Sequence, residues 1–309
     1  MSWWKNLLDN GVGKSIADAS SAMINMGIDF YNLVVEKASD LLTMSPVSFG
    51  VENTSVGIQS DGETVGAAWQ ALYNVNAAFV AVGSSMVGFF FLWGMYNQLR
   101  DSKFEVRFEG VLFDFIKLLI AEYFVSNNLY IVRGFLKVFQ SLMDTVAGKK
   151  GNSFVQLSLN DNVTKYLGEI DTLSGAIPVL IISLIFMMVI IIIALGLLFQ
   201  SFKRILKIMV IIPWGAIASA TLAGDNMVRG TAIGFWKYCI ATMGEAVTMI
   251  VVLKIYGAYF SSGMTLFVGS QMQGSTYICA WLFEKAFISF TALGLVSSAS
   301  TITQRSLGL

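Results

Sequence analysis

The clearest pattern in the chain is an uninterrupted apolar run in its second half. Residues 172–202 contain no charged side chain, and their core from Pro178 to Phe199 is almost wholly apolar. A helix rises about 1.5 Å per residue, so this core is long enough to cross a hydrocarbon layer about 30 Å thick. Because the run is apolar on every side, it does not fit the surface helix of a soluble protein. It predicts a transmembrane helix.

Further apolar stretches predict additional crossings. Ala77–Tyr96 belongs to a second charge-free stretch and ends in aromatic residues that suit a membrane interface. The other candidates are Phe108–Val125, Ile205–Ala223 with Pro213 inside it, Val228–Phe260 and, as an optional sixth span, Ile278–Ser300. The expected fold is an all-α integral membrane protein. It is a helical bundle of five to six transmembrane helices with an extracytoplasmic amphipathic N-terminal helix.

Two amphipathic helices are expected outside these spans. In the N-terminal arm, one predicted apolar face consists of Ile16, Ala19, Met23, Met26, Phe30 and Leu33, with Asp18, Asp29 and Lys37 off it. In Leu129–Val146, the stripe consists of Leu129, Val132, Leu136, Phe139, Leu142 and Val146, with Arg133, Lys137 and Asp144 off it. Ser45–Gly66 is rich in turn-forming residues and predicts a linker.

These elements divide the chain into consecutive segments. The predicted segments are an amphipathic N-terminal helix (1–45), a linker (46–76), a first transmembrane helix pair (77–126), an extracytoplasmic loop with an amphipathic helix (127–174), a transmembrane core (175–300) and a C-terminal tail (301–309). No repeat of fixed period and no inverted pair of interrupted helices is visible, which argues against a solenoid and weakens a secondary-transporter interpretation.

Two basic clusters predict the orientation. Arg100, Lys103 and Arg107 lie between the first two predicted spans, and Lys203 to Lys207 lies between the third and fourth. Short loops rich in Lys and Arg stay in the cytoplasm. This places the N-terminus, the loop 127–174 and the loop around Asp225 outside the cell.

The composition narrows the function. Hydrophobic residues make up 55% of the chain and charged residues only 13%, which excludes most soluble enzymes and disordered proteins. Lys and Arg (20) balance Asp and Glu (20), so no net charge attracts a polyanion. The chain has no His, and its two Cys lie in apolar stretches. With no base, nucleophile or metal-ligand set, we expect a protein that is not an enzyme and needs no cofactor or metal.

Ionisable residues inside the predicted spans are the first candidates for function, because such groups rarely face lipid. The candidates for a polar interior or subunit contact are Asp114, Lys117, Glu122, Glu245 and Glu284. Lys237 and Lys254 are expected to reach the interface instead.

Small residues one helical turn apart are candidates for close helix packing. These pairs are Gly215 with Ser219 and Gly230 with Gly234, and packing within the chain is favoured over a dimer contact. The uncharged run Gly257–Gln273 predicts a flexible loop, with a subunit contact or a re-entrant segment as the alternatives.

The order of features along the chain resembles a known family. The N-terminal helix ends in Leu41-Leu42-Thr43-Met44-Ser45-Pro46, and a span, a basic turn and a charged helix then lead to Asn127-Asn128. After the apolar span come Phe202-Lys203-Arg204-Ile205-Leu206-Lys207, Ile212-Pro213-Trp214-Gly215-Ala216-Ile217-Ala218, Gly230-Thr231-Ala232 and the closing Leu293–Ser300. Over roughly residues 15–305 this is similar to the TrbL-type polytopic membrane proteins of conjugative type IV secretion systems, especially those on Gram-positive mobile elements.

The resemblance implies a non-enzymatic subunit of a translocation channel in the cytoplasmic (inner) membrane of a bacterium. It implies a homo-oligomeric ring, for which five subunits would fit, beside secretion and coupling ATPases. Membrane lipid is then a partner, and translocating single-stranded DNA or protein substrate a transient one. A DNA conduit would be expected to have basic lumen residues, yet the charges within these spans are balanced. The alternative is a multi-pass transporter of a small solute or ion, with Asp114, Lys117 and Glu245 at its site.

Overall fold

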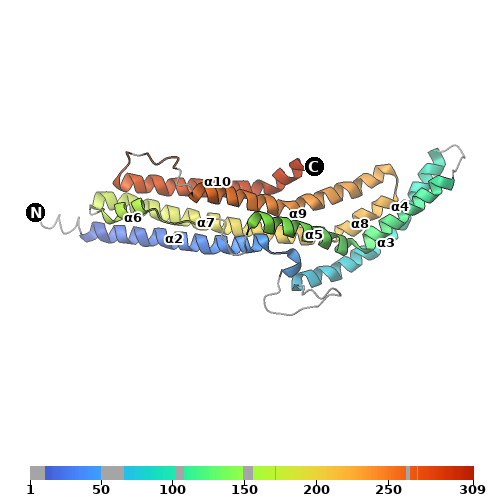
Figure 1. Ribbon diagram of the computed structural model, residues 1–309. Helices are drawn as coiled ribbons and strands as arrows, with labels where there is room; N and C mark the ends of the chain where they lie inside the picture. The colour runs from blue at the N-terminus through green and yellow to red at the C-terminus, as the bar shows by residue number, and fades with distance from the viewer. Residues whose placement is uncertain are drawn as a thin grey trace, which may run out of the picture. The chain divides into compact units, whose positions relative to one another are not determined.

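The computed structural model describes residues 11–49, 66–101, 108–148, 156–170, 172–261, 265–269 and 271–309. Within these ranges the chain is helical and contains no strand (Figure 1). The helices are α2 (Gly13–Thr43), α3 (Ala67–Asp101), α4 (Phe108–Ser126), α5 (Asn128–Ala147), α6 (Asp161–Gly168), α7 (Leu173–Ile211), α8 (Trp214–Ala220), α9 (Asn226–Ser261) and α10 (Gly274–Ser306), with short 3₁₀ turns η2 (Pro46–Ser48) and η3 (Thr221–Ala223).

The chain divides into two compact units. The first unit contains residues 1–42, 147–202 and 249–298, and the second contains residues 43–146, 203–248 and 299–309. Each of the long helices α7, α9 and α10 is divided between the two units.

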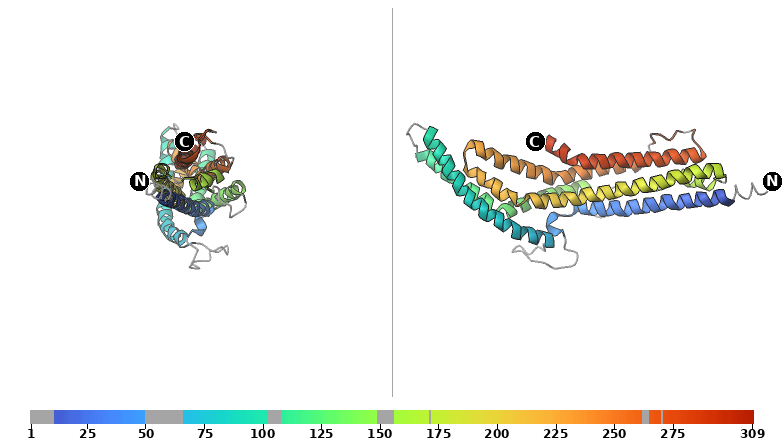
Figure 2. Two further views of the ribbon diagram at one scale, coloured as in Figure 1. Left: turned by 90° about the vertical axis from the view of Figure 1, so that its left-hand side faces the viewer. Right: turned by 180° about the vertical axis from the view of Figure 1, so that it is seen from behind.

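The first unit consists of long helices that run side by side, as both views in Figures 1 and 2 show. α2 approaches α7 closely at Gly27, where a β-carbon would lie 3.3 Å from Met187 Cγ. α9 is joined to α10 by a buried hydrogen bond between Tyr256 Oη and Ser289 Oγ, 2.7 Å long. Asn32 of α2 also exchanges two hydrogen bonds of 2.8 Å with the backbone of Leu157. The unit is therefore tied by polar contacts as well as by apolar packing.

The packed face of α2 differs from the predicted one. The buried residues include Ile24, Ile28 and Tyr31, whereas Met26 and Leu33 of the predicted stripe are exposed over 66% and 60% of their surface. Both faces of α2 carry apolar side chains, so the periodicity alone could not select the packed one. An apolar stripe consequently stays on the surface of this helix.

The second unit is built around a helical hairpin. α3 and α4 pack against each other and against α8 and η3, with a core that includes Val87, Ala121, Val125 and Ala216. Gly83 permits the close approach of α3 to α8, because a β-carbon there would lie 2.9 Å from the Ala216 carbonyl oxygen. Helices with small residues at the contact can approach to such a distance.

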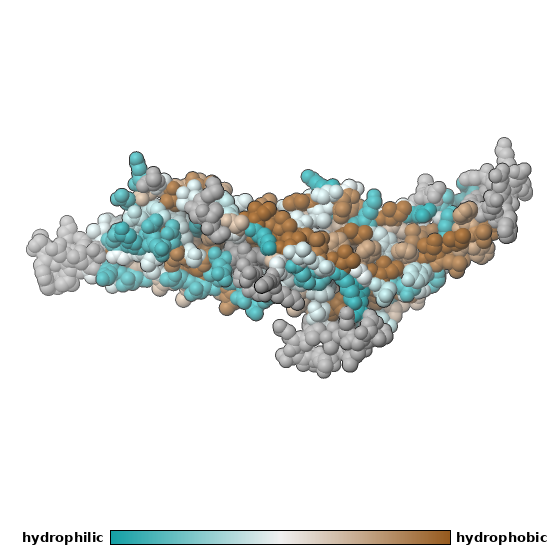
Figure 3. Space-filling model, in the orientation of Figure 1, coloured by the Kyte–Doolittle hydropathy of each residue, from teal (hydrophilic) through white to brown (hydrophobic). Residues whose placement is uncertain are grey.

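Among the described residues, four helices are long and apolar enough to cross a membrane, and a bent pair makes a fifth. The four are Ala67–Asn97, Leu173–Ile211, Val228–Phe260 and Gly274–Ser306; the pair is Val111–Ser126 with Asn128–Ala147, bent by 70°. The protein is thus a multi-pass helical membrane protein. Hydrophobic side chains gather over α3 and α4, whereas α2 and α6 present hydrophilic residues (Figure 3). Leu92 and Leu119 are exposed over about two thirds of their surface, at 66% and 68%.

The predicted span Ile205–Ala223 is wrong. α7 continues to Ile211, and Pro213 separates it from α8, which is only seven residues long. Proline has no N–H to donate to the carbonyl of residue 209, so the helix breaks there. The basic cluster Lys203–Lys207 therefore lies within α7 and not in a loop. The other cluster falls mostly on residues 102–107, outside the described part of the chain.

Candidate functional site

A buried ion pair joins three helices in the second unit. Lys207 Nζ of α7 lies 2.8 Å from Glu245 Oε2 of α9 and donates a 3.1 Å hydrogen bond to Ser300 Oγ of α10. The Lys207 ammonium also lies 5.8 Å from the centre of the Tyr238 ring. The Glu245 side chain is only 9% exposed and that of Lys207 23%. Each charge thus supplies the counter-charge that the other needs away from water.

A second cation is buried beside this pair. Arg204 lies almost one turn before Lys207 on α7, is 1% exposed and interacts electrostatically with Glu245. The sequence singled out Glu245 for its central place in a span, and the structure places it in the interior. Its partners were treated only as indicators of orientation, because they are about 40 positions away along the chain.

The acidic residues of α4 are also held within the chain. Asp114 is buried and accepts a 2.8 Å hydrogen bond from Lys117, which is three positions further along the same helix. Glu122 is half-buried and accepts 2.9 Å hydrogen bonds from Ser84 of α3 and Ser126 of α4. Asp114 and Glu122 therefore bind side chains of the same hairpin.

Glu284 anchors a non-helical segment in the first unit. Its side chain is wholly buried and accepts hydrogen bonds from the backbone N–H groups of Leu266 and Phe267, at 2.8 and 2.9 Å. Phe267 also contacts two aromatic rings of α10, and Lys285 lies 4.3 Å from the centre of the Phe260 ring. The uncharged run was predicted to be a flexible loop, yet its first residues belong to α9 and residues 266–267 are bound by Glu284.

Two helix breaks meet at one asparagine in the second unit. Asn128 begins α5 immediately after the 70° bend. Its Nδ2 donates to the Ile212 carbonyl at 2.8 Å, at the break between α7 and α8, and lies 3.2 Å from Asn76 Oδ1 of α3. Asn128 is fully buried and Asn76 is 5% exposed. The sequence predicted the first break, between Phe108–Val125 and Leu129–Val146, and placed Pro213 inside a span. It did not show that the two breaks meet, because Asn128 and Ile212 are 84 positions apart.

The first small-residue pair lies at packed positions. Gly215 is buried, and a β-carbon on it would collide with the Asn128 side chain. Ser219 is fully buried and accepts a 3.1 Å hydrogen bond from Trp236 Nε1 of α9. Both residues therefore serve contacts around α8.

The second pair is placed differently. Gly230 and Gly234 are exposed on α9, and a β-carbon on either would meet no described atom within 4 Å. The packing within the chain that was favoured for this pair is not seen in the part of the chain that the structure describes.

Arg133 is the residue that the pattern placed least well. It was expected off the apolar stripe of its helix, but it is only 6% exposed. Leu142, expected on the stripe, is 44% exposed. A long cationic side chain can be covered by neighbouring helices while its helical position still faces away from the apolar stripe.

The described residues contain no group of three or more His, Cys, Asp or Glu side chains placed to hold a metal ion. No protein-family model, curated protein or solved structure matches this chain.

Proposed function

We propose that this chain is a non-enzymatic, multi-pass subunit of a type IV secretion or conjugation channel in the bacterial cytoplasmic membrane. The observation that carries the proposal is the pairing of charges within the spans. Lys207 with Glu245 and Lys117 with Asp114 lie at 2.8 Å from each other within the chain. Each of these charges therefore has its counter-charge within the chain and needs no bound solute or ion to balance it. The TrbL-like order of features supports the same conclusion.

The proposed partners follow from the channel role. The subunit would form a homo-oligomeric ring of five copies. The secretion and coupling ATPases would lie beside this ring. The exposed apolar stripe of α2, with Met26 and Leu33, is a surface on which lipid or a neighbouring subunit would rest. The translocating single-stranded DNA or protein would contact the ring only transiently.

The test is a transfer assay in the native host. An in-frame deletion should abolish transfer of the mobile element to a recipient while donor growth stays unchanged, and the intact gene should restore it. A deletion strain that transfers at the parental frequency would refute the proposal.

A solute or ion transporter remains the second candidate, and the meeting of two helix breaks at Asn128 favours it. Transporters often bind their substrates where helices are interrupted near the middle of the membrane. Liposomes containing the purified protein should then accumulate a solute from an ion and metabolite panel, and Asn128→Ala or Glu245→Gln should abolish the uptake. Uptake of none of these solutes would count against this function.

A further inference from the structure

Two cavities lie along α5 in the second unit, and Arg133 lines both of them. One cavity, of about 620 Å³, lies between α5 and residues 45–47 and is also lined by Lys137. The other, of about 530 Å³, lies between α5, the end of α4 and α3, where Asn76 and Asn127 contribute amide groups. Arg133 thus lies where the two cavities adjoin.

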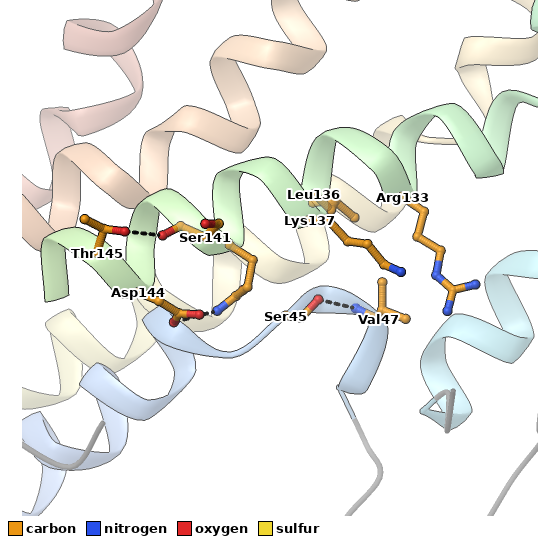
Figure 4. A pocket seen from close by; sticks show the side chains of 9 residues that line it. Ser45, Val47, Arg133, Leu136, Lys137, Ser141, Asp144 and Thr145 are labelled. Atoms are coloured by element: carbon orange, nitrogen blue, oxygen red, sulfur yellow. Dashed lines mark hydrogen bonds between the residues drawn. The ribbon is translucent and has the colours of Figure 1, made fainter. Parts of the chain in front are cut away.

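The first cavity has two cations on one side. Arg133 and Lys137 are one helical turn apart, and both extend from α5 toward the space beside Val47 (Figure 4). Further along the helix, Asp144 also lines this cavity and accepts a 3.2 Å hydrogen bond from Gln140, so the cavity contains two cations and one carboxylate. A guanidinium group together with an ammonium group is the side-chain combination that binds phosphate oxygens.

These cations follow a bend in an apolar segment of the chain. α4 is long and apolar enough to cross a membrane only together with α5, and it ends at Ser126 beside the cavities. α5 then turns away by 70° and is amphipathic, with Val138 exposed over 66% of its surface. Amphipathic helices of this kind lie in the interface between hydrocarbon and water.

Aromatic residues surround the second cavity. Trp69 and Tyr73 of α3 and Tyr130 of α5 line it, and Tyr73 and Tyr130 are exposed over 49% and 69% of their surface. Tyrosine and tryptophan are enriched at the level of lipid headgroups, because their rings are apolar and their tips are polar. The cavities therefore combine phosphate-binding cations with the aromatic residues of a membrane interface.

We propose that Arg133 and Lys137 bind the phosphate group of an anionic phospholipid. Basic cavities beside membrane helices bind such headgroups. The exposed apolar side chains of α5 favour a lipid over free phosphate, because they offer a surface for acyl chains. They also favour a lipid over a nucleic acid strand, which would need a groove that follows its backbone.

Native mass spectrometry of the full-length protein in detergent tests this site. The protein is incubated with phosphatidylglycerol or with phosphatidylcholine of the same acyl chains, and bound lipid is counted. We expect phosphatidylglycerol to bind more tightly. Arg133→Gln and Lys137→Gln should each weaken its binding about fivefold, the effect of one basic residue near a membrane surface. Lys165→Gln, which removes an exposed cation on α6, is the matched control and should leave binding unchanged.

Several results would overturn the proposal. They are equal binding of the two lipids, an equal loss in Lys165→Gln, and unchanged phosphatidylglycerol binding in Lys137→Gln. Displacement of the lipid by an equal concentration of inorganic phosphate would assign the site to free phosphate instead. Displacement by a single-stranded oligonucleotide would assign it to nucleic acid. Lys137 is exposed, so its variant keeps the test valid even where Arg133→Gln fails to fold.

Discussion

The ion pair between Lys207 and Glu245 should contribute strongly to the stability of the folded protein. Glu245→Gln leaves the Lys207 ammonium without its counter-charge in a largely buried place. Removal of one partner of a buried pair costs about 3–5 kcal/mol, whereas replacement of both by apolar residues of similar volume is often neutral. We therefore expect Glu245→Gln to lower the unfolding temperature in detergent. The double variant Lys207→Met with Glu245→Leu should recover part of the loss, because the buried Arg204 still lacks the charge of Glu245.

The exposed pair Lys165–Glu169 provides the control, because its side chains are 69% and 56% exposed. Lys165→Met should change stability by less than about 1 kcal/mol. A double variant at Lys207 and Glu245 that is as unstable as the single ones would contradict the importance of charge pairing.

The side chain of Asn128 should contribute far more to the stability of the fold than that of its neighbour Asn127. Asn128→Ala removes the hydrogen bond that joins the helix breaks and the one to Asn76 of α3. It leaves the Ile212 carbonyl without that donor, at a cost of about 1–3 kcal/mol. Asn127 donates only to the Tyr123 carbonyl of its own helix, so Asn127→Ala is the matched control. Thermal unfolding of the two variants should differ clearly, and equal stability would show that the junction is held by packing alone.

The buried phenol of Tyr31 should make the stability of the first unit depend on pH. Burial raises the pKa of its phenol, with Tyr256 as a second cause, well above the ordinary value. The neutral phenol is therefore favoured in the folded state, and its stabilisation is complete below the unfolded-state pKa of about 10. Stability should fall as the pH rises above that value. Tyr31→Phe should reduce this alkaline loss, measured by unfolding at several pH values, and an unchanged profile would contradict the assignment.

At the scale of the helix, the close approach of α3 to α8 makes a sharp prediction. Gly83→Ala forces a β-carbon against the Ala216 backbone and should destabilise the protein by about 1–3 kcal/mol. Gly88, on the same helix, has no described atom within 4 Å of an added β-carbon. Gly88→Ala should therefore be neutral or stabilising by up to about 1 kcal/mol, because alanine favours helix. Equal melting temperatures for the two variants would argue against this packing.

The sequence predicted most helices and their ends well, but it missed the break at Pro213. The charge-free stretch fixed the existence of α7, but Pro213 was assigned to the interior of a span when it ends one. The residues on both sides of Pro213, from 208 to 223, are uncharged and mostly apolar, so hydrophobicity carries no signal for that break. The packed face of α2 was also misassigned, since Met26 and Ile24 are both apolar and the neighbouring helices determine which of them is buried.

Only part of the candidate site could be predicted from the sequence, because its residues are far apart along the chain. A carboxylate in the middle of a span, such as Glu245, is conspicuous by itself. Its partner Lys207 is 38 positions away, and Asn128 is 84 positions from Ile212. No local pattern indicates which distant residues will meet, so the polar contacts required the folded structure.

At the scale of the whole molecule, the loss of one predicted span changes the membrane topology. The sequence placed residues 127–174 and the loop around Asp225 on the same side, with two crossings between them. The structure has one long helix, α7, between them, followed by the short α8 and η3. Ten residues from Trp214 to Ala223 are too few to cross a bilayer. The two regions should therefore lie on opposite sides.

The most direct test is the labelling of single cysteines with an impermeant reagent, after Cys239 and Cys279 are replaced by serine. Asn162→Cys lies before α7 and Arg229→Cys lies after η3, and both positions are exposed. We predict that one of them is labelled in intact cells and the other only after permeabilisation, with Asn162→Cys on the outside in the proposed orientation. Labelling of both positions from the same side would contradict a single crossing by α7 and with it the arrangement described here.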